Sequence, residues 1–305
     1  MKLNAFLIIA HNNFSILEKI LRLLDHEEND FYIHIDSKVK DFDENLFKKL
    51  CKLSSVTFVE RINVTWGGYS LVECELLLLK AACKKQYSFY HLISGVDMPL
   101  KTNEEINTFL RNNIGYNYIG LDKHTENNQD HFIYDRVRYY YFMQEKIGSV
   151  ITIKNLGYKL FDKVSVMLQK IIKIDRTKKI DYKLHKGAQW FSISQQMAEY
   201  IVSCESEIKN LCNYGFCVDE VFLQTIAYRS PYSDKIVNKT LRYIDWKRGQ
   251  PYTFRNNDFN ELISVGEDRL FARKFDEKID AVIINRLYQH LLDQNKVNLA
   301  EVRLR

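Results

Sequence analysis

The first third of the chain alternates between short apolar runs and longer segments whose apolar residues recur at helical spacing. The short runs predict buried strands at residues 4–10, 31–36, 56–60 and 88–94. The longer segments predict helices at residues 12–25, 42–50, 69–85 and 103–112. Because strands that alternate with helices form a mostly parallel sheet covered by helices on both faces, the sequence predicts an α/β fold.

Polar residues stand at the carboxyl ends of three predicted strands. His11 follows the first strand, Asp36 ends the second, and Asp97 comes shortly after the fourth. Open α/β sheets bind ligands in the crevice at the carboxyl ends of their strands, so these residues are candidate ligand contacts. The turn after the first strand carries neither of the glycine-rich phosphate motifs, which disfavours an NAD-binding or P-loop site there.

The rest of the chain shows no internal repeat and no Pro/Ser-rich linker. Its apolar spacing predicts a basic amphipathic helix near residues 154–173, and then further elements: a strand at 188–193, a helix at 195–204, a helix opening at 219–220, strands at 241–244 and 270–273, and a helix at 277–292. We therefore expect one compact domain over residues 1–305.

The charge of the chain is small overall but unevenly distributed. The net charge is +5, and the segment from Lys154 to Lys186 holds ten basic residues against three acidic ones. A nucleic-acid binder would be basic over a wider surface and would carry a recognisable reader motif. The pattern predicts one basic segment, 154–186, on a body that does not bind nucleic acid.

The sequence also bears on the cellular location of the protein and on the redox state of its cysteines. No apolar run approaches the roughly 20 residues of a transmembrane helix, and the apolar stretch after Met1 is too short for a signal peptide. The six cysteines form no C-x-x-C pair, so buried reduced thiols are favoured over a zinc site. We expect a cytoplasmic protein.

A set of short signatures occurs in one order along most of the chain. They are AHN at 10–12, HIDSK at 34–38, WGGYS at 66–70, HLISGVDMPLK at 91–101, KGAQWF at 186–191, DEVFLQT at 219–225, LRYIDW at 241–246 and FARKF at 271–275. Together they resemble glycosyltransferase family 14, the core-2/I-branching β-1,6-N-acetylglucosaminyltransferases and peptide O-xylosyltransferases. The resemblance runs from about Phe6 to Asp280.

The resemblance implies an inverting transferase with a GT-A-like, Rossmann-type mixed sheet, a UDP-sugar donor and no required metal ion. It implies a nucleotide-sugar-binding half at 1–120 and an acceptor-binding, catalytic half at 121–305. The family's catalytic base corresponds to Glu220. Its nucleotide contacts correspond to Asp36 on the uridine side and to Arg242 and Lys274 at the diphosphate.

The chemistry of inverting transfer asks for the same kinds of residue. One carboxylate must accept the proton of the acceptor hydroxyl, and positive charge must meet the leaving diphosphate. Without a metal ion, Arg and Lys supply that charge. Further candidates on the donor side are His11, Trp66, Asp97 and Arg248. Candidates on the acceptor side are Arg136, Arg138, Trp190 and Asp219. For each of them an ordinary structural role is the alternative.

The sequence departs from the family pattern in two places. Asp41-Phe42-Asp43 spells the D-x-D of metal-dependent transferases, but it opens a predicted helix, so we interpret it as a capping pair. Val218 stands where family members often have proline before the Asp-Glu pair, a change in loop stiffness that leaves both carboxylates in place.

The basic segment has two interpretations. Its lysines and apolar residues would let the protein rest on an anionic membrane surface and meet a lipid-linked acceptor. Alternatively, it is an ordinary helix docked on the core.

The leading hypothesis is transfer of N-acetylglucosamine from UDP to a glycan hydroxyl, with a β-linkage, in the synthesis of a bacterial surface polysaccharide. A β-xylosyltransferase or another UDP-sugar transferase on the same scaffold is the enzymatic alternative. A membrane-associated glycan-binding protein is the non-enzymatic one.

Overall fold

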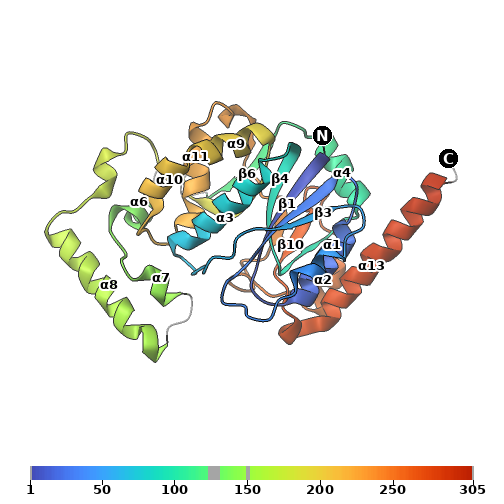
Figure 1. Ribbon diagram of the computed structural model, residues 1–305, viewed down its shortest axis with the longest axis horizontal. Coiled ribbons are helices and arrows are strands. Elements are labelled where there is room, and N and C mark those ends of the chain that lie inside the picture. Colours follow the sequence, from blue (N-terminus) through green and yellow to red (C-terminus); the bar gives the residue numbers. More distant parts are fainter. Residues whose placement is uncertain (1, 123–130, 149–151, 304–305) are drawn as a thin grey trace. The chain divides into compact units, whose positions relative to one another are not determined.

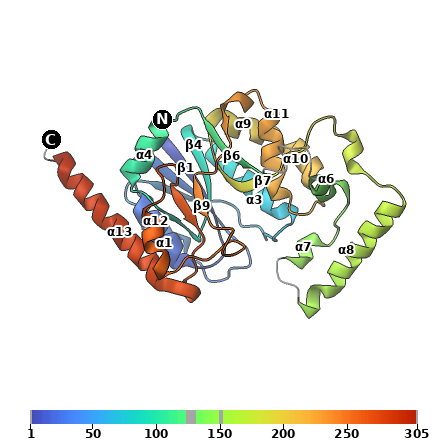
Figure 2. The same cartoon turned by 180° about the vertical axis from the view of Figure 1, so that it is seen from behind.

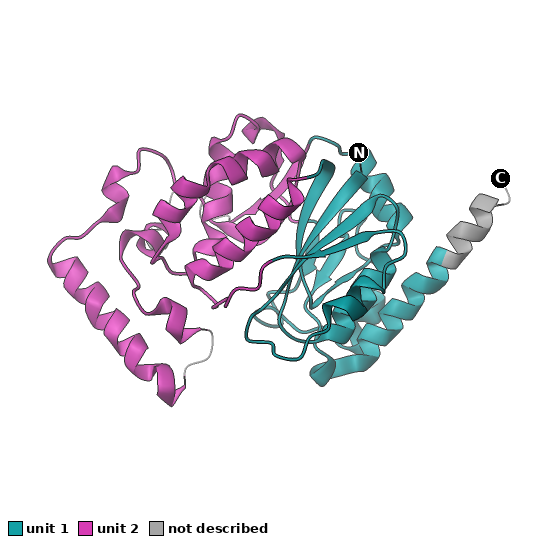
Figure 3. Ribbon diagram, viewed as in Figure 1, with its two compact units in different colours: residues 1–59, 85–115, 241–305 teal, residues 60–84, 116–240 magenta. Residues whose placement is uncertain are grey.

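The computed structural model describes residues 2–122, 131–148 and 152–303. Their residue contacts separate them into two compact units, coloured in Figure 3. Unit 1 consists of residues 1–59, 85–115 and 241–305, and unit 2 consists of residues 60–84 and 116–240. Each unit is assembled from segments that are far apart in the sequence.

Unit 1 contains the strands and helices of the amino-terminal alternation, except the helix at residues 69–82, together with the carboxyl-terminal segment (Figure 1). Its strands are β1 Lys2–Ala10, β2 Asn29–Ile35, β3 Ser55–Phe58, β4 Tyr87–Ser94, β5 Asp97–Pro99, β9 Arg242–Ile244 and β10 Phe271–Arg273. Its helices are α1 Phe14–Leu24, α2 Glu44–Lys48, α4 Asn103–Arg111, η4 Asn256–Asp258, α12 Phe259–Ile263 and α13 Glu277–Arg303.

Four parallel strands form the main sheet of unit 1, in the order β3-β2-β1-β4. Every residue of β2 and β4 is buried, as expected for parallel strands covered on both faces. In the register, Ala10 pairs with Ile35, and Ile9 pairs with Ser94. The last residues of three strands therefore lie side by side, and the loops that follow them begin at one edge of the sheet.

A second, three-stranded sheet in unit 1 has the order β5-β10-β9. Strand β10 pairs antiparallel with β5 and parallel with β9, which brings Arg273 opposite Asp97. This pairing joins the polar loop after β4 to residues that are far away in the sequence.

Unit 2 is richer in helices, and Figure 2 shows it from the opposite side. Its strands are β6 Asn117–Leu121, β7 Gly187–Ile193 and β8 Ile236–Val237. Its helices are α3 Tyr69–Ala82, α6 His131–Arg138, α7 Gln144–Ile147, α8 Ile153–Ile171, η1 Arg176–Lys179, α9 Gln195–Ser203, α10 Glu205–Cys212, η2 Val218–Glu220, α11 Phe222–Arg229 and η3 Ser233–Lys235.

The strands of unit 2 have the order β7-β6-β8, with β6 antiparallel to β7 and parallel to β8. The β6–β7 ladder has a register shift between Ile119 and Leu121. At this irregularity the backbones approach so closely that a Cβ on Gly187 would lie 1.8 Å from the carbonyl oxygen of Gly120. Only glycine fits at position 187 without movement of the backbone.

The predicted α/β class and mixed sheet are confirmed, and every strand and helix expected in the first third is present. Asp43 caps α2 as expected, accepting hydrogen bonds from the backbone N–H groups of Asn45 (2.9 Å) and Leu46 (3.1 Å). Asn13 stands at the start of α1 in a left-handed conformation without a side-chain capping bond. None of the helices in the described residues is both long and apolar enough to span a bilayer.

Candidate active site

Glu220 ends a single 3₁₀ turn, η2, that follows Cys217. Cys217 has a left-handed backbone (φ 49°), and its N–H donates to the carbonyl of Gly67 at 2.8 Å. Val218, which replaces the proline of the family pattern, is fully buried and anchors this turn. The sequence predicted a helix opening at residues 219–220, with Asp219 in its first turn. Instead it lies inside η2, and α11 begins at Phe222 without a side-chain cap.

Two cations of unit 2 contact the Glu220 carboxylate. The Arg136 guanidinium donates to Oε2 at 2.9 Å, and Lys186 Nζ lies 3.7 Å from the same oxygen. The same guanidinium nitrogen also donates to the carbonyl of Cys217 at 2.6 Å. The Glu220 side chain is 38% exposed. Its second oxygen, Oε1, makes no hydrogen bond within the described part of the chain. The carboxylate is thus held on one side and open on the other.

Asp219, the residue before Glu220, is buried. Burial, and secondarily the charge of Glu220, raise the pKa of the Asp219 carboxyl to about 7. Its Oδ1 is enclosed and has no hydrogen-bonding partner among the described residues. The predicted acceptor contact of Asp219 stays a prediction, and the burial of its carboxyl favours a supporting role beside Glu220.

A second buried acid, Glu75, lies close enough to Asp219 for the charge of Asp219 to act on it. It lies on the apolar helix α3 with no exposed surface, and the Gln189 amide donates to its Oε1 at 2.9 Å. Burial raises the pKa of Glu75 well above its usual range, and the Asp219 charge adds to this. Sequence reasoning missed Glu75. Of the two acids in residues 69–82, Glu73 and Glu75, only Glu75 directly precedes the leucine run 76–79, and that position was the available signal.

Lys186 directly precedes Gly187, the residue at which the backbones of β6 and β7 approach closely. Its carbonyl accepts from the N–H of Asp122 at 3.0 Å, and its ammonium forms an ion pair with the Asp122 carboxylate. Lys186 stood in a recognised signature but was not assigned a role.

The other candidates of unit 2 lie in different settings. Arg138 pairs with Asp135 (3.0 Å) and lies 3.6 Å from Asp175. Trp190, a predicted acceptor contact, is buried in β7, which favours the alternative of a core aromatic residue, and its acceptor role stays a prediction. Trp66 is 54% exposed and meets the Phe216 ring edge-on at 6.1 Å, so only this tryptophan of the pair presents a surface on which a sugar or base can stack.

In unit 1 the strand ends bring His11, Asp36 and Lys38 together. Asp36 is nearly buried, and it accepts from the Lys38 N–H at 2.8 Å and pairs with its ammonium at 3.1 Å. Desolvation lowers the pKa of His11, with Lys38 and Arg273 adding to the effect and Asp36 opposing it. The neutral form of the His11 imidazole is therefore favoured.

Asp97 is the centre of a second polar group of unit 1. It accepts from the Ser94 N–H (3.0 Å) and hydroxyl (2.7 Å) and from the Arg273 guanidinium (2.8 Å). Arg273 also donates to the Ser94 hydroxyl. Lys274 follows Arg273 directly and is half-buried, and its ammonium has no ion pair within the described residues. Of the predicted phosphate ligands, Lys274 is the one with an uncommitted charge.

Arg242 and Arg248 lie in settings that sequence analysis did not anticipate. Arg242 is 2% exposed, donates to the Leu92 carbonyl at 2.6 Å, and lies over the Phe271 ring. Burial lowers its pKa to about 9. Arg248 forms ion pairs with Asp245, with Asp258 at 2.7 Å and with Glu261 at 2.7 Å. A contact with the donor phosphates was expected for both. The contacts favour a core role for Arg242 and a carboxylate cluster for Arg248, and their phosphate roles stay predictions.

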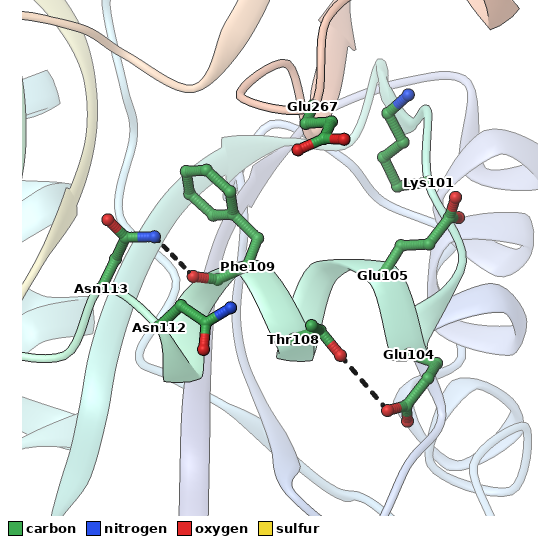
Figure 4. A pocket seen from close by; sticks show the side chains of 8 residues that line it. All are labelled: Lys101, Glu104, Glu105, Thr108, Phe109, Asn112, Asn113 and Glu267. Atoms are coloured by element: carbon green, nitrogen blue, oxygen red, sulfur yellow. Dashed lines mark hydrogen bonds between the residues drawn. The ribbon is translucent and has the colours of Figure 1, made fainter.

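An open pocket of unit 1, with a volume of about 500 Å³, runs along α4 and contains none of the predicted site residues (Figure 4). Three glutamates, Glu104, Glu105 and Glu267, line it together with a single cation, Lys101. Such a lining would repel a nucleoside diphosphate, so this pocket is not the donor site.

Comparison with known proteins places the chain. The profile of the Core-2/I-Branching enzyme family matches residues 4–263. The chain belongs to this family. It is 24% identical to rat xylosyltransferase 2 over 94% of its own length and 33% of that protein. It is 22% identical to human xylosyltransferase 1 over 94% of its length and 30% of that protein. The chain therefore spans about a third of these curated relatives.

A solved structure of mouse xyloside xylosyltransferase 1 aligns with 89% of the chain and 97% of its own, at 9% identity and a TM-score of 0.38. That likeness is too distant to bear on function. In this chain, the predicted base and acceptor residues lie in unit 2. The predicted donor residues fall in unit 1, apart from Trp66. That the two groups face each other stays a prediction.

Proposed function

We propose that the chain is an inverting glycosyltransferase that moves a sugar from a UDP-sugar to a hydroxyl of a glycan acceptor, with Glu220 as the general base. The observation that carries the proposal is the Glu220 carboxylate, which Arg136 and Lys186 fix at Oε2 while Oε1 is left unengaged. A carboxylate held in this way is suited to accept a hydroxyl proton. Membership of the Core-2/I-branching family supports it.

In the proposed reaction, the acceptor oxygen attacks the anomeric carbon of the donor. The bond from that carbon to the diphosphate oxygen breaks on the opposite face, the hydroxyl proton passes to Glu220, and UDP leaves. Lys274 is our first choice for contact with the diphosphate, because its ammonium has no other ion pair among the described residues. His11 and Asp36 are proposed for the nucleoside side, and Arg136 and Trp66 for the edge of the sugar site.

The donor sugar has two candidates. N-acetylglucosamine follows from the core-2/I-branching resemblance. Xylose is favoured by the names of the curated relatives, which are xylosyltransferases. Turnover of UDP-N-acetylglucosamine and UDP-xylose, measured separately as release of UDP with a panel of glycan acceptors, distinguishes them.

We further propose that turnover does not require a metal ion, and that the protein works in the cytoplasm on a surface-glycan precursor. Asp43 of the D-x-D string is used as a helix cap, which supports the first part. Full activity in EDTA is the expected result. Loss of activity in EDTA that manganese restores would contradict metal independence and leave the transferase assignment intact.

The main test is the Glu220→Gln variant. A missing general base lowers turnover by roughly 10²–10⁴-fold, whereas the affinity for UDP, measured by calorimetry, stays within a few-fold. Glu199→Gln, an exposed glutamate of α9, is the matched control and keeps native turnover. Native turnover in Glu220→Gln would refute the base. Glycan binding by the wild type without UDP binding would favour the non-enzymatic alternative.

A further inference from the structure

Helix α8 is attached to unit 2 by its polar side. The Asp162 carboxylate accepts from the Met143 N–H at 3.0 and 3.2 Å. Two helical turns further on, Gln169 accepts from the Tyr140 N–H at 2.8 Å and donates to the Tyr140 carbonyl at 2.9 Å. These two residues are the buried ones of α8. They are seven positions apart and share one side of the helix.

The apolar side of α8 is left uncovered. Its members recur every three or four positions, so they form one stripe along the helix. Their exposed fractions run from 44% to 96%, and they are Ile153, Leu156, Leu160, Phe161, Val164, Met167, Leu168 and Ile171. A helix that belonged to an ordinary core would bury this stripe and expose its polar side. In Figures 1 and 2, α8 lies at the outer edge of unit 2.

Basic residues flank the stripe. Lys159, Lys163 and Lys170 share one side of α8 at spacings of four and seven, between the docked side and the apolar stripe. Lys154 lies near the start of the helix and Lys173 just after its end, and both are exposed. The one acid of α8 is Asp162, which is buried. No carboxylate on α8 is available to neutralise the lysines at its surface.

We propose that this face of α8, defined by the eight apolar residues and by Lys159, Lys163 and Lys170, docks in the headgroup region of an anionic lipid bilayer. Apolar side chains enter the boundary with the acyl chains while flanking lysines meet the anionic headgroups. A second copy of the chain fits less well, because two such faces would bring like charges together. The inference is independent of the proposed reaction.

Flotation of the full chain with lipid vesicles tests the proposal. The protein is expected to float with vesicles of phosphatidylcholine and phosphatidylglycerol in equal parts, and to stay behind with phosphatidylcholine alone. Lys159→Gln/Lys163→Gln/Lys170→Gln is expected to lower partitioning into the anionic vesicles by roughly 100-fold, since each lysine near such a surface contributes several-fold. Added salt is expected to weaken wild-type binding in the same direction.

Leu160→Ser/Val164→Ser tests the apolar half of the surface. Both side chains are exposed, so the variant is expected to keep its thermal transition and lose vesicle binding. Ile114→Ser, an exposed apolar residue of unit 1, is the matched control and keeps binding. Absence of binding to the anionic vesicles would overturn the proposal. So would self-association of the wild type that Leu160→Ser/Val164→Ser abolishes without any vesicle binding.

Discussion

Arg136 contacts Glu220 and also the turn that carries it. One guanidinium nitrogen donates to Glu220 Oε2 at 2.9 Å and to the Cys217 carbonyl at 2.6 Å. The side chain is 20% exposed, so both bonds are partly shielded from water. The direction in which the carboxylate points is therefore tied to the backbone position of the residues before it.

Arg136→Ala should remove both bonds at once. Charged hydrogen bonds of this kind contribute about 1.5–3 kcal/mol, so we expect a loss of about that size in the free energy of unfolding, measured in urea. We also expect kcat to fall by a larger factor than KM changes, because Glu220 loses its orientation. Arg136→Lys keeps the charge but should restore only part of kcat. Arg229→Ala, which breaks a pair with Glu207 elsewhere in unit 2, should leave kcat unchanged.

The stability of the protein should fall as the pH rises through the range set by Asp219. Its pKa is raised to about 7 in the folded state, against about 3.9 in an unfolded chain. Between these values the folded state holds a proton that the unfolded state has lost, so stability declines with rising pH and levels off above the folded pKa.

Asp219→Asn should remove that decline. The variant should gain on the wild type by up to about 4 kcal/mol between about pH 4 and pH 8. Urea unfolding at several pH values measures the difference. Asp181→Asn, at an exposed acid of the same unit, is the control and should follow the wild-type curve. Parallel pH profiles for wild type and Asp219→Asn would contradict the burial of this carboxyl.

Gly187→Ala should destabilise the chain strongly. The new Cβ would meet the Gly120 carbonyl oxygen at 1.8 Å and its carbon at 2.8 Å, so the β6–β7 ladder must separate. We expect a cost of about 3 kcal/mol or more in thermal or urea unfolding, together with reduced turnover as Lys186 moves. Gly157→Ala on α8 has nothing within 4 Å and should instead stabilise its helix by about 0.5–1 kcal/mol.

Lys274→Ala and Arg248→Ala should have opposite effects. Lys274 has no ion pair among the described residues, so its loss should leave unfolding nearly unchanged and weaken UDP binding by roughly 10–100-fold, if the diphosphate role holds. Arg248 pairs with three carboxylates, so its loss should lower stability and leave UDP affinity within a few-fold. Calorimetric titration with UDP and urea unfolding separate the two. Equal UDP affinity in Lys274→Ala would contradict its proposed role.

The elements of the first third followed from local pattern because their strands are long and apolar. Strands β1, β2 and β4 are buried over most or all of their length, and such runs are visible in the sequence. The strands β5, β6 and β8 were not predicted. They have three, five and two residues, and their pairing partners lie elsewhere in the chain, so no local period indicates them.

For single residues, the sequence predicted the location at the strand ends better than the burial and the contacts of the side chain. The strand-end location of His11, Asp36 and Asp97 followed from parallel pairing, and the structure confirms that their strands end side by side. The burial of Arg242 and the carboxylates around Arg248 could not be predicted from the sequence. The local sequence around an arginine does not indicate whether its guanidinium contacts solvent, a carbonyl or a carboxylate. The partners are supplied by distant segments.

The amino-acid sequence alone determined the alternation of strands and helices, the family signatures and the amphipathic character of α8, because all three depend on residues close together in the chain. Tertiary structure decided which side of α8 is docked, that Asp219 and Glu75 are buried, and which cations are already paired. Each of these depends on neighbours that are distant in the sequence. The arrangement is selected by the free-energy cost of burying a charge and by steric limits such as the lack of room for a Cβ at Gly187.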